Sequence, residues 1–421
     1  MIPYGISDYV RLRREGYYYI DKTRYITFFE QYPPYLFLIR PRRFGKSLFL
    51  SMMEAYYDLH YKSEFEELFK ETYILENPTQ GRNSYYVLRF DFSQVDSRDA
   101  LFNFNAYCNE TLRQFLENYG IELDLTYENS NLNLVRVNQY LQLKRLPLYV
   151  MIDEYDNFVN ELLGKSEEEY KKMVTGQEAI YKQFFRTLKA GTGGTDAPVK
   201  KILITGVSPL AMFDLTSGYN IGMNITTDSS FDDLLGVTKE EVMEMLKIYG
   251  LAAKQDDIFA RMDDWYNGYK FSRDVEHTIY NTDMVLYYIN SLIQKNEEPE
   301  ELIDINVRSD YSKIRFLVQT GKKLNGNFSV LQELLSTGRV RVSKIADSFS
   351  ALDIRDRNNF VSLLFYLGLI TIEKYELGLL TLRIPNQTIQ KILATFIQKA
   401  LEEQDVFPIR LDSFNLLVQE L

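Results

Sequence analysis

The sequence is poor in residues that bind metals through sulfur or imidazole. Its 421 residues include one cysteine, Cys108, and two histidines, His60 and His277. A disulfide within the chain is therefore impossible, and a zinc site built from cysteine or histidine is not expected. Cys108 lies in a stretch with helical spacing, where we expect a buried and unreactive thiol.

The sequence also lacks long apolar runs. It contains no stretch of about 18 consecutive apolar residues, and its N-terminus has no apolar signal core. We therefore expect a cytoplasmic protein that makes no contact with a membrane.

Basic residues are outnumbered in this chain. It has 48 Lys and Arg against 59 Asp and Glu, so its formal net charge is −11. This balance does not support general binding to nucleic acid, although a basic patch could still exist locally. One basic cluster is present, formed by Arg40, Arg42, Arg43 and Lys46.

The first 230 residues alternate strand-like apolar runs with stretches of helical spacing. Strands separated by helices predict an α/β fold, with a parallel sheet covered on both faces. The expected strands are 17–20, 35–39, 85–92, 148–153 and 201–207, and the expected helices are 46–59, 100–118, 132–144 and 178–190.

The character of the sequence changes near residue 236. Residues 238–250 begin with Thr and acidic residues, a signal for a helix N-terminus, and the chain then reads as mostly helical to about residue 290. A charged connector follows at 294–303, and residues 369–384 predict a hairpin that turns at Gly378. Helices around such a hairpin favour a winged-helix-like fold. We therefore divide the chain into 1–235, 236–293 and 294–421.

The strongest local signal is a strand, a loop and an amphipathic helix in residues 35–50, with Gly-Lys-Ser at the start of the helix. Free amides and the dipole at a helix N-terminus favour an anion, and Gly45 allows close approach to a phosphate. In this interpretation Lys46 reaches the β and γ phosphates, and Ser47 offers its hydroxyl to Mg²⁺. The remaining expected contributors to ATP binding are Arg40, Arg42, Arg43, Phe44 and Leu48.

This motif departs from the full phosphate-loop pattern, which has Gly where the chain has Arg40. The alternative is a structural turn between strand and helix that carries a solvated basic cluster.

An acidic pair follows the apolar run that ends at residue 152. The strand would bring Asp153 to the carboxyl edge of the sheet, where it could hold Mg²⁺. The adjacent Glu154 could orient and deprotonate the attacking water, so Asp153 and Glu154 are the expected catalytic residues. We expect Asp156 to be solvated or to cap a helix. The alternative for the whole segment is that it only caps the following helix.

Three further positions are candidates for contact with the γ-phosphate. Thr205 and Ser208 lie at the end of the strand predicted at 201–207, and either could sense the phosphate. Either could equally cap a helix that starts at Pro209, with Ser208 at the N-cap. Lys270 lies in the motif 265–271 and could approach the phosphates if residues 236–293 close as a lid. Arg186 is an arginine-finger candidate, but a surface helix position is favoured for it.

Seven motifs occur in an order that resembles the predicted AAA-ATPase-like proteins common in gut anaerobes. The resemblance spans about residues 3–390, and it implies a P-loop NTPase of the additional-strand class with the sheet order of AAA modules. That family shares the loop sequence RPRRFGKS, so Arg40 agrees with its version of the motif. The motifs are 18–26, 40–53, 91–93, 152–156, 204–210, 265–271 and 384–386.

The resemblance also implies a nuclease module as an alternative partner, because many members carry a restriction-type nuclease domain at the C-terminus. Such a domain needs Glu-x-Lys on a strand, whereas Glu169-Tyr170-Lys171 lies in a polar run. We therefore expect no nuclease activity from these residues.

Two hypotheses remain at this point. The first is a Mg²⁺-dependent ATPase whose nucleotide state moves the lid and the C-terminal module. The alternative is a non-catalytic, nucleotide-dependent switch, or a module that binds protein or nucleic acid. Glu154 favours hydrolysis, because a protein that only binds ATP does not need it. A monomer or dimer is expected, since no arginine finger acting in trans can be named.

Overall fold

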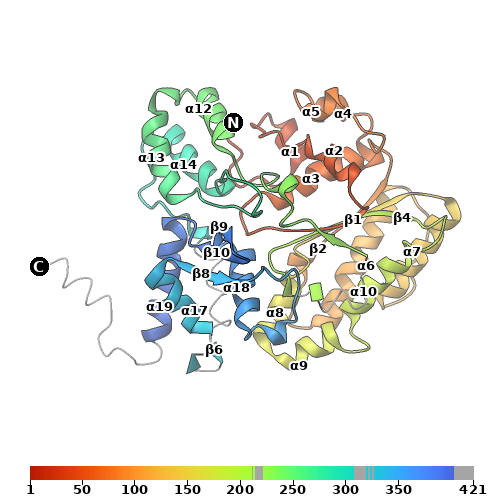
Figure 1. Cartoon of the computed structure of the whole chain (residues 1–421). Helices are drawn as coiled ribbons and strands as arrows, with labels where there is room; N and C mark the ends of the chain where they lie inside the picture. The colour runs from red at the N-terminus through yellow and green to blue at the C-terminus, as the bar shows by residue number, and fades with distance from the viewer. Residues whose placement is uncertain (211, 214–220, 308–318, 321–322, 325–326, 403–421) are drawn as a thin grey trace, which may run out of the picture. The chain divides into compact units, whose positions relative to one another are not determined.

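The computed structural model describes residues 1–402 except 211, 214–220, 308–318, 321–322 and 325–326. The chain divides into two compact units (Figure 1). Unit 1 contains Met1–Gly236 with Asp347–Ala351, and unit 2 contains the described residues of 237–346 and 352–402. Apart from Gly236 and Asp347–Ala351, the described residues of the expected lid and of the expected C-terminal domain thus fall in the same unit.

A five-stranded parallel sheet forms the centre of unit 1. The strand order is β2-β3-β4-β1-β5, so β4 lies between β1 and β3. This topology confirms the predicted α/β fold with an additional strand. The strands are β1 (Tyr35–Ile39), β2 (Tyr86–Asp91), β3 (Leu148–Asp153), β4 (Val199–Gly206) and β5 (Met223–Asn224).

Helices cover both faces of this sheet. In Figure 1, α1, α2 and α3 lie on one side of it, and α6, α7 and α10 lie on the other. All six residues of β3 are buried, because helices pack on both of its faces. The helices are α1 (Tyr9–Arg14), α2 (Tyr25–Gln31), α3 (Lys46–Tyr57), α4 (Phe65–Leu68), α5 (Tyr73–Glu76), α6 (Ala100–Asn118), α7 (Ser130–Lys144), α8 (Asn157–Lys165), α9 (Glu167–Tyr170) and α10 (Ile180–Ala190).

Aromatic side chains form much of the packing between these layers. Tyr57 of α3 meets Tyr149 of β3 with ring centroids 5.1 Å apart, and Phe90 of β2 meets Phe184 of α10 at 5.1 Å. Both pairs are edge-to-face, a favourable arrangement for aromatic rings. Cys108 on α6 is buried as predicted, and burial raises the pKa of its thiol far above the usual range.

The prediction of a strand at residues 17–20 is wrong. These residues connect α1 to α2 without joining the sheet. The ring of Tyr19 instead packs edge-on against Tyr9, with centroids 5.0 Å apart. A short aromatic run has the same pattern whether it packs in a strand or in a loop, so periodicity could not separate the two.

Unit 2 combines helices with a small antiparallel sheet. Thr238 and Glu241 form a capping box at the start of α12, at the predicted helix start. The predicted hairpin is confirmed as β9 and β10, joined by Leu377 and Gly378, and the sheet order is β8-β10-β9. The main elements are α12 (Lys239–Ile248), α13 (Gln255–Trp265), α14 (Thr282–Lys295), β6 (Gln319–Thr320), β7 (Lys323–Leu324), α17 (Asn327–Thr337), β8 (Arg339–Val342), α18 (Arg357–Tyr366), β9 (Thr371–Glu376), β10 (Leu379–Arg383) and α19 (Gln387–Glu402).

Within the described residues, none of the helices combines the length and the apolar character needed to cross a bilayer.

Asp58 at the end of α3 makes the stability of unit 1 depend on pH. Its carboxylate accepts hydrogen bonds from His60 N and the Tyr119 hydroxyl, each at 2.8 Å, yet burial raises its pKa to about 6. The folded state then holds this proton more tightly than the unfolded state, so its contribution is complete below about pH 4 and is lost as pH rises through about 6.

We expect Asp58→Asn to flatten this dependence by about 1–3 kcal/mol, because Asn can accept the same two hydrogen bonds without a charge. Urea unfolding at pH 4, 5, 6 and 7 measures the effect. Asp228→Asn is the control, since Asp228 also accepts from a main-chain amide and a tyrosine hydroxyl. An unchanged slope in Asp58→Asn would show that Asp58 does not titrate in this range.

Candidate functional site

The loop between β1 and α3 ends in a backbone conformation that requires glycine. Gly45 precedes α3 with φ of +94°, and a Cβ there would meet no other atom within 4 Å. The requirement is therefore conformational rather than steric. No side chain caps α3 at this position, so its first amides are available to an anion.

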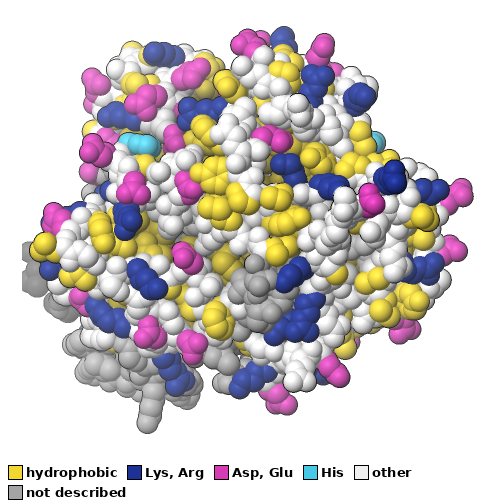
Figure 2. Space-filling view, turned by 45° about the vertical axis from the view of Figure 1, so that its right-hand side comes forward, with side chains coloured by type: hydrophobic (Ala, Val, Ile, Leu, Met, Phe, Trp, Pro, Cys, Tyr) yellow, Lys and Arg dark blue, Asp and Glu magenta, His cyan; other side chains and the backbone are white. Residues whose placement is uncertain are grey.

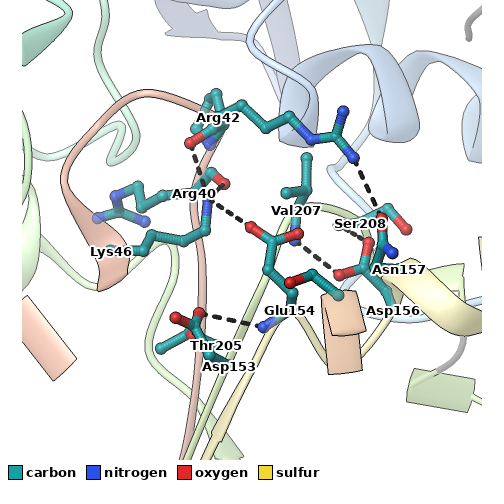
Figure 3. A network of polar contacts seen from close by, with 12 residues as sticks. Arg40, Arg42, Lys46, Asp153, Glu154, Asp156, Asn157, Thr205, Val207 and Ser208 are labelled. Atoms are coloured by element: carbon teal, nitrogen blue, oxygen red, sulfur yellow. Dashed lines mark hydrogen bonds and ion pairs between the residues drawn. The ribbon is translucent and has the colours of Figure 1, made fainter. Parts of the chain in front are cut away.

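Lys46 lies folded against this loop. Its side chain is 4% exposed, and its Nζ lies 3.0 Å from the carbonyl oxygens of Arg40 and Pro41. The same nitrogen lies 3.8 Å from Oε1 of Glu154 (Figure 3). The ammonium group thus contacts the main chain of the loop and lies beside the acidic pair.

The other predicted loop residues differ in their surroundings. Arg42 is half-buried, and its guanidinium extends towards Asn157, with 3.4 Å between NH2 and Oδ1 (Figure 3). Arg43 is exposed and has a positive φ of 70°. Phe44 is buried and its carbonyl accepts from Gly236 N at 3.2 Å, whereas Ser47 and Leu48 are half-buried in the first turn of α3.

Arg40 is fully buried, and its guanidinium serves the backbone of unit 1. NH1 donates to the carbonyl of Thr226 at 2.5 Å, and NH2 donates to that of Phe231 at 2.8 Å. These bonds fasten the start of the loop to the segment that follows β5. Because NH1 and NH2 both donate to main-chain carbonyls, Arg40 holds the start of the loop in place. Its contact with phosphate stays a prediction.

Asp153 ends β3 and is bound on several sides. Its Oδ1 accepts from the Thr205 hydroxyl at 2.6 Å and from Glu154 N at 3.1 Å. Its Oδ2 lies 3.5 Å from NH2 of Arg89, which also donates to Glu54 of α3 at 2.9 Å. The ends of β3 and β4 are therefore in direct contact, because Thr205 holds the Asp153 carboxylate.

Glu154 follows with a backbone conformation that is uncommon for its residue type. Its φ is +50°, and such outliers occur at functional sites. Burial raises the pKa of its carboxyl to about 6, and Lys46 acts in the opposite direction. The group is thus able to exchange a proton near neutral pH.

Asp156 is neither solvated nor a helix cap, so that prediction is wrong. The residue is 1% exposed, and its carboxylate accepts from Val207 N at 3.0 Å and Ser208 N at 2.8 Å. It precedes α8 but makes no capping bond with its side chain. Asp156 therefore fixes the chain that follows β4, next to Thr205.

Gly206 explains why the two strand ends approach so closely. A Cβ at this position would lie 2.4 Å from the ring of Tyr155 and 2.5 Å from Asp156 Oδ1. Ser208 is buried beside them, and its carbonyl accepts from the Tyr155 hydroxyl at 2.6 Å. Only glycine fits between the acidic segment and β4.

Sequence reasoning missed Arg89. Its signal was a charged residue between the apolar residues Leu88 and Phe90 of β2, where long charged side chains are rarely placed without a partner. Its two partners, Glu54 and Asp153, come from α3 and β3, so only the fold reveals them.

The remaining candidates lie elsewhere. Lys270 belongs to unit 2, where its Nζ lies 3.4 Å from the carbonyl of Glu373, and its contact with phosphate stays a prediction. Arg186 is exposed on α10. Glu169 and Tyr170 lie in α9 and not in a strand, which agrees with the expectation for the Glu-x-Lys sequence.

No cluster of three or more His, Cys, Asp or Glu side chains that could enclose a metal occurs in the part of the chain that the structure describes. Mg²⁺ bound with a nucleotide needs no such cluster, because one or two protein oxygens, phosphates and water complete its shell. The buried carboxylate of Asp153 and the hydroxyl of Ser47 are donors of this kind. The residues present therefore fit Mg²⁺.

The chain is similar to a known protein family and to a curated relative. The family described as predicted AAA-ATPase matches residues 3–216. The uncharacterized protein in the vnfD 5′ region of Azotobacter chroococcum mcd 1 is 28% identical over 299 residues, which cover 70% of this chain and 52% of the relative. The chain thus spans about half the length of that curated relative.

Solved structures that match this chain over most of its length share little sequence with it. Aeropyrum pernix ORC2 in its ADPNP and ADP complexes is 10% identical with a TM-score of 0.43, covering 93% of this chain and 98% of that chain. Cdc6p from Pyrobaculum aerophilum is 9% identical with a TM-score of 0.30, covering 93% and 95%. Drosophila ORC bound to DNA is 8% identical with a TM-score of 0.32, covering 93% and 92%.

Asp156→Asn should destabilise unit 1 by about 2–4 kcal/mol, because the substitution removes a buried charge from two amide donors and can turn an NH₂ group towards them. Urea unfolding at pH 7 measures the loss. Asp124→Asn, at an exposed aspartate, is the control and should stay within about 0.5 kcal/mol of wild type. Equal stability of both variants would remove the anchoring role of Asp156.

Proposed function

Because the chain belongs to the family of predicted AAA-ATPases, we propose that it binds ATP with Mg²⁺ at the loop before α3 and hydrolyses it. The observation that carries this proposal is the meeting of Lys46 with the acidic pair. Lys46 Nζ lies 3.8 Å from Glu154, and Asp153 is held at 2.6 Å by Thr205. The residues that we propose as phosphate binder, metal ligand and base thus lie together at the carboxyl edge of one sheet.

Lys46 and the first amides of α3 would bind the phosphates. Arg42 and Arg43 add positive charge beside them. The ammonium of Lys46 rests on two carbonyls of its own loop, and phosphate oxygens can replace these weak acceptors. When Lys46 turns to a phosphate, its attraction for Glu154 falls, which would free that carboxylate for a water molecule.

Ser47 and Asp153 would hold Mg²⁺, which neutralises charge on the β and γ phosphates when it is bound. Thr205 fixes the Asp153 carboxylate and would sense the γ-phosphate. Asp156 holds the main-chain amide of Ser208, the second proposed sensor. Glu154 would orient the attacking water and accept its proton.

The C-terminal part of unit 2 supports a second element of this proposal. The order α17, β8, α18, β9, β10, with β10 paired to both β8 and β9, supports the proposal of a winged-helix-like fold for this part. In this proposal the nucleotide state moves this C-terminal module and the lid at 236–293. Closure of the lid would bring Lys270 to the phosphates.

The partner of this module is proposed to be a protein or a nuclease module rather than nucleic acid. On the face seen in Figure 2, Lys and Arg side chains are mixed with Asp and Glu side chains. This mixture and the net charge of −11 give nucleic acid no broad basic surface on that face. We also propose that the protein acts in the cytoplasm, as a monomer or a dimer.

The assigned roles predict a separation of binding from turnover. We expect Lys46→Ala to lower ATP affinity by at least about tenfold, because the phosphates lose their point charge. Glu154→Gln should keep affinity within about threefold of wild type and lower turnover by about 100-fold, because it loses only the base. Calorimetry and phosphate release with Mg²⁺ measure both quantities.

Lys70→Ala and Glu71→Gln are the matched controls for these variants, since Lys70 and Glu71 form an exposed ion pair outside the site. Binding without turnover in wild type would instead favour the nucleotide-dependent switch. Absence of ATP binding would refute both functions.

The raised pKa of Glu154 predicts how turnover depends on pH. The base must be ionised to accept a proton, so turnover should fall as pH drops through about 6. Steady-state hydrolysis from pH 5 to 8 under saturating ATP measures the profile. In the residual activity of Glu154→Gln this inflection should be absent, and an inflection that persists would assign the titration to another group.

A further inference from the structure

Unit 2 contains a pocket of about 540 Å³ that is lined by residues of this unit alone. Its volume is within the range of sites for small organic molecules. The residues that line it come from the end of α13 and its following loop, the end of α17, β8, β10 and the start of α19. They include Asp264, Asn267, Gly268, Arg339, Arg383 and Gln390.

Hydrogen bonds at this pocket join two segments that are far apart in the sequence, 265–268 and 385–388. Asn386 Nδ2 donates to the carbonyl of Asn267 at 2.8 Å, and the Thr388 hydroxyl donates to that of Trp265 at 2.7 Å. Gly268 has φ of +98°, and a Cβ there would lie 2.3 Å from the carbonyl oxygen of Pro385. These contacts give the pocket a pre-formed base.

Arg383 brings a positive charge to the pocket. The Glu373 carboxylate attracts this charge, but the two side chains form no hydrogen bond or ion pair within the described residues. Arg383 is half-buried, and NH1 donates to the carbonyls of Ile384 at 3.1 Å and Pro385 at 3.0 Å. Its other nitrogens make no hydrogen bond or ion pair with any residue that the structure describes. Burial lowers the pKa of this guanidinium.

The neighbouring strand adds to this charge. Arg339 of β8 is the cross-strand partner of Arg383, and like charges in such positions repel. Arg339 is neutralised by a bidentate contact with Glu373, at 2.6 and 2.7 Å, whereas Arg383 has no such acceptor. An oxyanion would supply Arg383 with the acceptor that its surroundings lack.

The acidic residues of the lining, Asp263 and Asp264, indicate which further groups a ligand would carry. Asp264 makes no hydrogen bond or ion pair within the described part of the chain, whereas Asp263 accepts from the Tyr280 hydroxyl and from Asn267 Nδ2. A carboxylate accepts hydrogen bonds and cannot donate them. A ligand that contacts both residues would therefore place donors at Asp264 and an anionic group at Arg383.

We propose that this pocket binds a small organic anion whose phosphate or carboxylate contacts Arg383 and whose hydroxyl or amino groups donate to Asp264. The site is built entirely from residues of unit 2, so it is distinct from the proposed ATP site in unit 1.

Calorimetry on the full chain in a Lys46→Ala background tests the proposal, because we expect that substitution to weaken phosphate binding at the loop before α3. The probes are ribose 5-phosphate, which has a phosphate and hydroxyl groups, and glutamate, which has carboxylates and an amino group. Binding of the first probe alone assigns a phosphate head group, and binding of the second alone assigns a carboxylate. Inorganic phosphate serves as the head group without a donor-bearing body.

Arg383→Gln should weaken the probe that binds by at least about tenfold, the value of one charge-assisted contact. Asp264→Asn changes an exposed side chain and should weaken the same probe without affecting inorganic phosphate or the melting temperature. Arg273→Gln, at an exposed arginine over the Tyr375 ring, is the control and should leave binding unchanged. Absence of binding for both probes, or equal binding in Arg383→Gln and Arg273→Gln, would overturn the proposal.

Discussion

The parallel pairing of β4 with both β1 and β3 is the constraint on which the candidate site depends. Ile39 lies beside Gly206 in one pair, and Ile152 lies beside Ile204 in the other. The ladder continues past the strands, because Arg40 N donates to Gly206 O at 3.2 Å and Tyr155 N donates to Thr205 O at 3.1 Å. The phosphate loop and the acidic pair, which are more than a hundred residues apart, must therefore emerge side by side.

Buried charges around this edge have different kinds of partner. The kind of partner separates the residues that hold the loops from the residue that we propose binds phosphate. Asp156 accepts from two main-chain amides, and Arg40 donates to main-chain carbonyls, so both charges are used to hold loops. Lys46 instead rests on two carbonyls of a loop that would wrap a phosphate, and it lies near Glu154. Its partners are the ones that a stronger acceptor can displace.

Unit 2 shows the same principle at its pocket. The motif around Gly268 and the segment that starts at Ile384 meet because a glycine allows Pro385 to approach the backbone. Arg339 is satisfied by Glu373, and its neighbour Arg383 is not matched in the same way. Charges that a fold leaves without a partner mark positions where a ligand would be stabilised.

The sequence by itself determined the parallel α/β fold, the positions of β1, β3 and β4, and the gathering of Lys46, Asp153 and Thr205 at one edge, because strand patterns and loop motifs are local signals. It also determined the hairpin around Gly378. Only the tertiary structure decided that Arg40 serves the backbone, that Asp156 is buried against β4, and that Arg89 links Asp153 to Glu54. These outcomes depend on partners distant in the sequence, and a residue's type does not reveal which distant group the fold will bring to it.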